Sequence, residues 1–151
     1  MGVHGRPGAS LRMWRDYFSR AEIVGADIDA GVLLTEPRIQ TFHLDQTDPE
    51  SIADLWRQVN VEFFELMIDD GLHEFYAGSC LFSNSIHKLA VNGIYIIEDV
   101  KATDLASYRQ FFASRPYTVD YVNLHRPGME VENNSLIIIR HGQPAGQGYH
   151  E

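Results

Sequence analysis

Two apolar stretches of the sequence each end in a pair of adjacent acidic residues. The stretch over residues 63–68 runs into Asp69 and Asp70, and a later stretch runs into Glu98 and Asp99. Such a run is typical of a buried parallel strand, and the carboxyl ends of parallel strands form the edge where open α/β folds bind ligands. Carboxylate oxygens are the ligands that hard divalent cations prefer. The two acidic pairs therefore predict a divalent metal site.

The elements that must position these acids alternate between strand and helix. Helical spacing and capping residues predict helices over residues 10–20, 49–60, 73–90 and 104–114. Apolar or alternating runs predict strands over residues 21–27, 38–44, 63–68, 93–97, 117–122 and 134–141. This alternation predicts an α/β fold with a doubly wound, Rossmann-like, mostly parallel sheet. No helix separates the last two strands, so we expect them to form an antiparallel hairpin at one edge.

Composition and charge restrict the class of protein. The chain has 151 residues, which favours one domain over residues 1–141, followed by a flexible tail over residues 142–151. A formal net charge of −9 argues against nucleic acid as a partner, because phosphate backbones select basic surfaces. The sequence has no long uncharged apolar run, so we expect no membrane partner. With Cys80 as the only cysteine, we expect a cytoplasmic protein.

Two further acids, Asp27 and Asp45, stand at the ends of other predicted strands. Aspartate often caps the helix that follows a strand, and for either residue alone a capping role accounts for the pattern as well as a functional role does. Acids are poor strand formers and are expensive to bury unpaired. Their recurrence at four strand ends therefore favours a shared cleft.

The ordered motifs resemble those of class I S-adenosylmethionine-dependent methyltransferases. Within that class, the chain looks most like the metal-dependent O-methyltransferases that act on sugars of macrolides and related natural products. The matching stretches are residues 8–14, 24–29, 45–48, 68–73, 93–100 and 134–139. The resemblance implies a Mg²⁺-dependent enzyme that transfers a methyl group from S-adenosylmethionine to a hydroxyl of a small molecule.

The resemblance also implies which residues contact the cofactor. Asp27 would accept hydrogen bonds from the ribose hydroxyls, and Asp45 and Gln46 would lie beside the adenine. The turn into the first helix would approach the methionine end, where a glycine allows close backbone contact. The implied cofactor-binding residues are Gly2, Gly8, Ser10, Asp27, Asp45 and Gln46.

For the metal, the resemblance implies Asp70, Glu98 and Asp99 as ligands and His73 as the catalytic base. Adjacent residues of a strand point to opposite faces, so Asp69 and Asp70 should not both be ligands. Asp69 stays an open alternative, and the spacing to His73 favours Asp70. A base three residues after the metal aspartate matches the spacing in the related catechol O-methyltransferases. There is a non-functional alternative for each of these residues. His73 could cap or pack against the following helix. Asp69 and Asp70 could be helix caps, and Glu98 and Asp99 could lie on a solvated rim.

One departure from the family concerns its first strand, which the sequence lacks because Met1 stands directly before Gly2. That strand is central in the doubly wound order and pairs on both sides. We therefore expect an N-terminally shortened version of a longer enzyme, or a gap that another chain closes, for example in a homo-oligomer.

Two other functions remain open at this point. The run Asp27-Ile28-Asp29 after an apolar strand is similar to the nucleophile motif of haloacid-dehalogenase-type phosphatases, which also need a downstream lysine and an acidic pair. Lys101 and the pair Asp69-Asp70 could take those roles. That interpretation leaves two further pairs without a role, Asp45-Gln46 and Glu98-Asp99. The missing strand is instead compatible with a non-catalytic, methyltransferase-like fragment.

Overall fold

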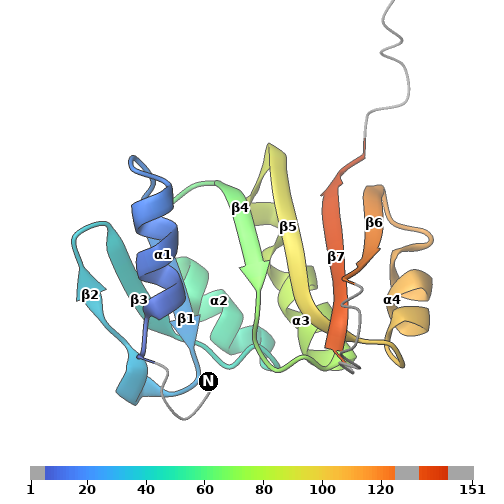
Figure 1. Ribbon diagram of the computed structural model, residues 1–151, viewed down its shortest axis with the longest axis horizontal. Coiled ribbons are helices and arrows are strands. Elements are labelled where there is room, and N and C mark those ends of the chain that lie inside the picture. Colours follow the sequence, from blue (N-terminus) through green and yellow to red (C-terminus); the bar gives the residue numbers. More distant parts are fainter. Residues whose placement is uncertain (1–5, 125–132, 143–151) are drawn as a thin grey trace, which may run out of the picture. The chain divides into compact units, whose positions relative to one another are not determined.

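The structure is a computed structural model that describes residues 6–124 and 133–142 (Figure 1). The chain divides into two compact units, Met1–Asn60 and Val61–Glu151, and each unit carries its own β-sheet. The single domain expected over residues 1–141 stays a prediction. Residues 143–151 of the expected tail lie outside the described part.

The first unit contains a three-stranded sheet in the order β1-β3-β2. Its elements are α1 (Ala9–Tyr17), β1 (Ile23–Asp27), the 3-10 helix η1 (Ala30–Val32), β2 (Thr35–Glu36), β3 (Ile39–His43) and α2 (Pro49–Gln58). β1 runs parallel to β3, and the short β2 runs antiparallel to β3. The apolar pattern predicts both parallel strands, whereas a two-residue strand carries too little pattern to be predicted.

Both helices of this unit pack by apolar contacts that the sequence makes possible. A Cβ atom on Gly25 of β1 would stand 2.7 Å from Leu11 Cδ1, so the glycine lets the Leu11 side chain of α1 pack directly against the strand. Helix α2 buries Ile52 and Leu55, which are three residues apart and share one face. The side chain of Asp48 accepts a hydrogen bond from a backbone N–H of the first turn, which confirms the predicted cap.

Helix α1 ends before the limit of the predicted helix over residues 10–20. The guanidinium group of Arg38 explains this early end. It donates hydrogen bonds of 3.0 Å to the backbone carbonyl oxygens of Arg15, Phe18 and Ala21. Carbonyls at a helix end need such partners, and a cation there also favours the negative end of the helix dipole.

The second unit contains a four-stranded sheet in the order β4-β5-β7-β6. Its elements are β4 (Phe64–Asp69), α3 (Phe75–Ser85), the 3-10 helix η2 (Ile86–Lys88), β5 (Leu89–Lys101), α4 (Leu105–Phe112), β6 (Tyr117–Asn123) and β7 (Asn133–His141). β4 pairs parallel with β5, while β7 lies between β5 and β6 and runs antiparallel to both. The antiparallel pair at the edge is therefore as predicted.

The predicted helix over residues 73–90 is too long, because β5 already begins at Leu89. Leu89 is buried and pairs with Phe64 of β4, and the neighbouring Lys88 donates a hydrogen bond of 2.7 Å to the Val61 carbonyl oxygen. Local spacing cannot reveal these long-range contacts. Helix α3 thus has 11 residues, and within residues 6–124 and 133–142 no helix is long and apolar enough to cross a membrane.

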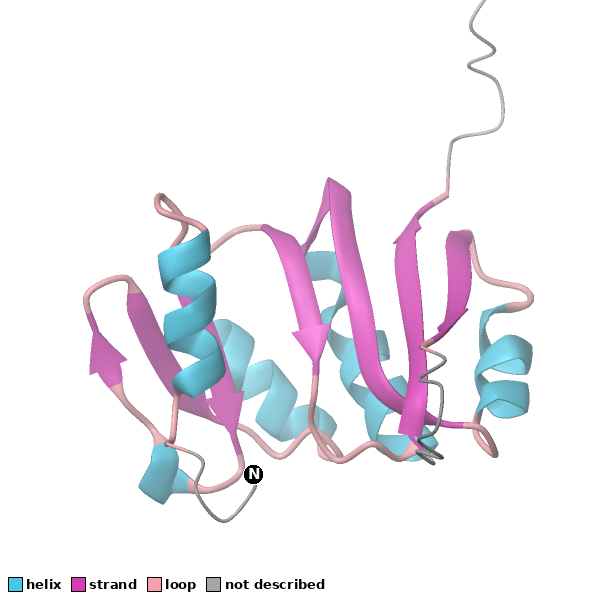
Figure 2. Ribbon diagram, in the orientation of Figure 1, coloured by secondary structure: helices cyan, strands magenta, loops and turns pink. Residues whose placement is uncertain are grey.

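The core of the second unit is an aromatic and aliphatic cluster between the strands and the helices; Figure 2 shows α3 behind the strands. Phe82 of α3 meets Tyr95 and Phe112 edge-on, with ring centroids 5.2 and 5.0 Å away. Ile137 and Ile139 of β7 are fully buried in the same cluster. Each such aromatic pair contributes about 0.5–1.5 kcal/mol beyond its buried area. This core holds α3, and with it the loop that leads from β4.

The parallel pairings within the two sheets agree with the predicted Rossmann-like fold. β1 pairs parallel with β3, and β4 pairs parallel with β5. β1 stands at an edge of the first sheet, and β4 stands at an edge of the second.

A substitution at Gly78 tests how closely α3 packs. A Cβ atom on this glycine would collide with the hydroxyl oxygen of Tyr108, a residue that is only 3% exposed. Alanine normally stabilises a helix interior by about 1 kcal/mol relative to glycine. We expect Gly78→Ala to lower the free energy of unfolding instead, by about 1–3 kcal/mol, as measured by urea denaturation.

The matched control removes the colliding atom. In the Gly78→Ala/Tyr108→Phe double variant, the loss should be smaller than the sum of the two single losses. Additive effects would show that the contact does not limit the packing of α3.

Candidate metal and cofactor sites

Strands β4 and β5 bring the two acidic pairs to one edge of the second sheet. The strands run parallel, and Asp69 pairs with Ile97 in their register. Asp70 and Glu98 are the next residues along the two strands. The acids that the sequence singles out for a metal thus leave the sheet side by side, at its carboxyl edge.

A β-bulge in β5 turns Glu98 and Asp99 out of the regular alternation of the strand. Between Ile97 and Val100 the register with β7 shifts, so β5 has one extra residue here. Asp99 has a φ of 50°, in the left-handed region that few non-glycine residues adopt. Bulges re-aim side chains and are frequent beside functional sites. As a result Asp99 is exposed while Glu98 stays half-buried.

The loop from β4 to α3 separates Asp69 from its acidic neighbour. Asp69 is 5% exposed, whereas the side chain of Asp70 is 58% exposed, so the two carboxylates point to opposite sides. His73 also lies in this loop, with a left-handed φ of 57°. Its Nε2 atom is 3.2 Å from Asp70 Oδ1, close enough for a hydrogen bond.

Three of the predicted residues converge on one point. One ligand atom each from Asp70, His73 and Asp99 lie within 4.8 Å of one another. Oxygen ligands of an octahedral Mg²⁺ stand about 2.1 Å from the ion, which puts neighbouring ligand atoms about 3 Å apart and opposite ones about 4 Å apart. The limit of 4.8 Å is wider than these separations, so the three residues form a group that could share a divalent ion after a small closure of the site. The structure groups His73, expected as the base, with two of the expected ligands.

Glu98, the third expected ligand, is coupled to the same cluster by its charge. Burial raises the pKa of Glu98, and the negative charges of Asp70 and Asp99 raise it further, while His73 opposes the shift. These carboxylates therefore repel one another in the metal-free protein. A divalent cation would relieve the repulsion, which is a second indication that the residues suit a metal.

The first unit places the expected cofactor residues at the carboxyl edge of its own sheet. Asp27 at the end of β1 pairs with His43 at the end of β3, and Asp45 and Gln46 follow directly after β3. Asp27 Oδ1 accepts a hydrogen bond of 2.9 Å from the backbone N–H of Asp29. The register therefore brings the two acids to the same edge.

Asp45 is held in a turn of its own. Its Oδ1 accepts hydrogen bonds from the hydroxyl and the backbone N–H of Thr47, at 2.7 and 2.9 Å. These two bonds lower the pKa of Asp45, which keeps the group ionised. The cap of α2 is Asp48, so Asp45 is not needed for that role.

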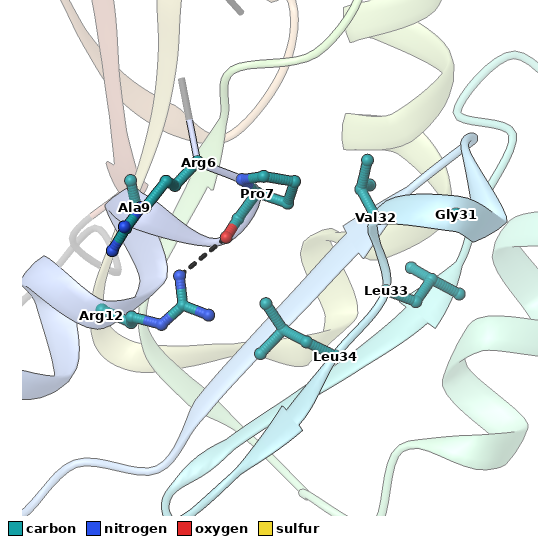
Figure 3. A pocket seen from close by; sticks show the side chains of 8 residues that line it. All are labelled: Arg6, Pro7, Ala9, Arg12, Gly31, Val32, Leu33 and Leu34. Carbon is teal, nitrogen blue, oxygen red and sulfur yellow. Dashed lines mark hydrogen bonds between the residues drawn. The ribbon is translucent and has the colours of Figure 1, made fainter. Parts of the chain in front are cut away.

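A hollow of about 650 Å³ opens beside the start of α1. Figure 3 shows Arg6, Pro7 and Ala9 on one side and the segment 31–34 on the other. Gly8 stands between Pro7 and Ala9 with a φ of 75°, and a Cβ atom there would collide with Leu34. The loop can therefore approach this closely only with a glycine.

The other expected cofactor residues fall differently around this hollow. Ser10 lies in the first turn of α1 and is exposed, while Asp27, Asp45 and Gln46 do not line the hollow. Gly2 lies outside the described residues. Arg6 and the segment 31–34 are lining residues that the sequence does not single out. No motif spacing marks the segment 31–34, since only the fold brings it against the Gly8 turn.

The fold is that of class I S-adenosylmethionine-dependent methyltransferases. The MycE methyltransferase of mycinamycin biosynthesis, solved in complex with Mg, SAH and mycinamycin VI, superposes with a TM-score of 0.65, over 95% of this chain and 42% of that one. A SAM-dependent methyltransferase from Anabaena variabilis superposes with a TM-score of 0.54, over 89% of this chain and 73% of that one. The sequence identities are 24% and 12%, so these likenesses establish the fold alone.

Sequence comparison finds relatives among the sugar O-methyltransferases of natural-product pathways. The chain is 36% identical over 96 residues to the 8-demethyl-8-alpha-L-rhamnosyl tetracenomycin-C 2'-O-methyltransferase of Streptomyces olivaceus. It is also 36% identical over 93 residues to the mycinamicin VI 2''-O-methyltransferase of Micromonospora griseorubida. The matches cover 64% and 62% of this chain but only 25% and 23% of the relatives. No protein-family model matches the chain. The resemblance to sugar O-methyltransferases of natural-product pathways is therefore confirmed for a part of their length.

The raised pKa of Glu98 predicts how stability depends on pH. Because the pKa of Glu98 is higher in the folded protein than in the unfolded chain, the folded protein binds the proton more tightly. The metal-free protein therefore loses stability as the pH rises past about 4.5 and through the raised pKa. Glu98→Gln has no titrating carboxyl and so avoids this loss of stability. In urea with a chelator at pH 7.5, we expect the variant to be more stable than the wild type by up to about 1 kcal/mol, since solvent screens a half-exposed site.

The stability difference between Glu98→Gln and the wild type should shrink as the pH approaches 4. Glu65→Gln, at an exposed position of β4, is the matched control and should change the stability by less than about 0.5 kcal/mol at either pH. A Glu98→Gln variant that is less stable than the wild type at pH 7.5 would contradict the repulsion.

Proposed function

We propose that this chain carries the cofactor and metal sites of a Mg²⁺-dependent O-methyltransferase that uses S-adenosylmethionine. The proposed acceptor is a hydroxyl on a sugar of a natural product, in line with the acceptors in the names of its relatives. The observation that carries the proposal is the convergence of Asp70, His73 and Asp99 at the carboxyl edge of β4 and β5. That edge is where this fold class binds its ligands.

In this proposal Asp70, Glu98 and Asp99 hold the metal ion. Bound Mg²⁺ would lower the pKa of a sugar hydroxyl, and S-adenosylmethionine would supply the methyl group. The bulge in β5 breaks the alternation of the strand at Glu98 and Asp99, which in this proposal lets both residues serve the metal site. The exposure of Asp70 and Asp99 leaves room for substrate oxygens.

His73 is the proposed base for the hydroxyl proton. If Nε2–H donates to Asp70 Oδ1 across their 3.2 Å contact, the other ring nitrogen is left as the proton acceptor. Asp70 then stabilises the charged ring and fixes its orientation. The pairing of an imidazole with a carboxylate is a common way to orient a general base.

The proposed cofactor site uses the edge of the first sheet. Asp27 offers the ribose its carboxylate, and Asp45 and Gln46 lie one strand away, beside the adenine. The close approach of the backbone at Gly8 and the first turn of α1 at Ser10 supply the site for the methionine end. Backbone N–H groups at a helix start suit a carboxylate.

Cofactor binding tests the first half of the proposal. Asp27→Ala should weaken binding of S-adenosylhomocysteine at least about 10-fold, because hydrogen bonds to a charged group contribute about 1.5–3 kcal/mol each. Calorimetric titration with and without Mg²⁺ measures this affinity. Asp54→Ala, an exposed acid on α2, is the matched control and should bind as the wild type does.

If Asp27→Ala binds S-adenosylhomocysteine as tightly as the wild type, Asp27 has no role in the cofactor site. A folded wild-type protein that binds none of this ligand would instead favour the non-catalytic fragment. No observation on the described residues favours the phosphatase, since Lys101, its required lysine, forms an ion pair with Glu74.

Metal binding and turnover test the second half. Asp70→Asn should lose Mg²⁺ binding, while His73→Gln should keep it and lower methyl transfer by about 10²–10⁴-fold, the usual contribution of a general base. Calorimetry gives the affinity, and labelled S-adenosylmethionine with glycosylated polyketide acceptors gives the turnover. Asp120→Asn, an exposed acid on β6, is the control. Loss of the metal in His73→Gln would make His73 a ligand and not the base.

A further inference from the structure

Asp69 is a buried acid to which the proposed function gives no role. It stands at the end of β4, directly before Asp70, and is 5% exposed. Burying a carboxylate is unfavourable unless its oxygens are engaged. An acid at this position of the fold therefore needs a structural reason.

One carboxylate oxygen of Asp69 holds the loop that carries the metal site. Oδ1 accepts a hydrogen bond of 3.3 Å from the backbone N–H of Gly71, so the side chain bridges over Asp70. Such a turn directs the chain away from the strand at that residue. The hydrogen bond joins Asp69 and Gly71, the residues on either side of Asp70, and so restricts the backbone at Asp70. The chain then continues to His73, which has a left-handed backbone.

The other oxygen of Asp69 faces helix α3. Oδ2 would lie 3.3 Å from a Cβ atom on Gly78, and the hydroxyl of Tyr108 approaches the same point. Burial raises the pKa of Tyr108 and of Tyr95, and the charge of Asp69 raises both further, so these phenols keep their protons. One side chain thus links the metal loop to the helix that follows it.

We infer that Asp69 is a positioning residue, which holds Asp70 and His73 in the arrangement that binds the metal. The inference rests on the proposed function, because the expected effect of Asp69 is on the affinity of the proposed metal site. It does not make Asp69 a ligand, because its carboxylate is buried on the opposite side of the chain from Asp70.

Three substitutions separate the geometry of Asp69 from its charge. Asp69→Asn removes the charge but keeps an oxygen that can accept from Gly71, whereas Asp69→Ala and the bulkier Asp69→Leu remove the acceptor. We expect calorimetry to show Mn²⁺ and Mg²⁺ affinities that are about 10- to 100-fold weaker in Asp69→Ala and Asp69→Leu than in Asp69→Asn. Asp69→Leu fills the space of the carboxylate and serves as the second variant if Asp69→Ala does not fold. Asp120→Ala is the surface control and should bind the ions as the wild type does.

Amide hydrogen exchange at Gly71, measured without metal, gives an independent readout. It should be faster in the Ala and Leu variants and close to the wild-type rate in Asn. Unchanged exchange together with equal metal affinity in Asn, Ala and Leu would overturn the inference. A wild-type protein that binds neither ion would instead refute the proposed metal role, while the exchange at Gly71 still decides whether Asp69 holds the loop.

Discussion

The parallel register between β4 and β5 is the constraint on which the candidate metal site depends. With Asp69 opposite Ile97, the residues that follow on each strand meet at the carboxyl edge. A slip of one residue would exchange the buried and exposed faces of β4 and turn Asp70 inward. The aromatic core around Phe82 and Tyr95 enforces this register, because α3 can bury its apolar face only if β5 presents the matching side chains. Packing on one side of the sheet thus determines chemistry at its edge.

The sequence predicts those parts of the site that depend on local pattern. Strand ends, the Asp48 cap and the separation of Asp69 from Asp70 all follow from alternation or capping rules. The bulge at Glu98 does not, because it results from pairing with β7, a strand far along the chain.

The same reason explains the errors in element length and the residues that were not foreseen. The end of α1 depends on Arg38, which directly precedes β3 and is far from α1 in the sequence. The start of β5 depends on its pairing with β4. The hollow beside α1 forms where the Gly8 turn meets Leu34, two segments with no shared motif. Each miss lies at a contact between distant parts of the sequence.

The metal-free site works against the stability of its own unit. Two of its residues, His73 and Asp99, have left-handed backbones, and Glu98 is half-buried among like charges. Each feature is unfavourable by itself and persists only where the surrounding structure enforces it. A chain under selection for stability alone would replace these residues, because neutral side chains at the same positions would relieve the repulsion. In the proposed metal site, the charge of a cation would turn this mutual repulsion into shared coordination.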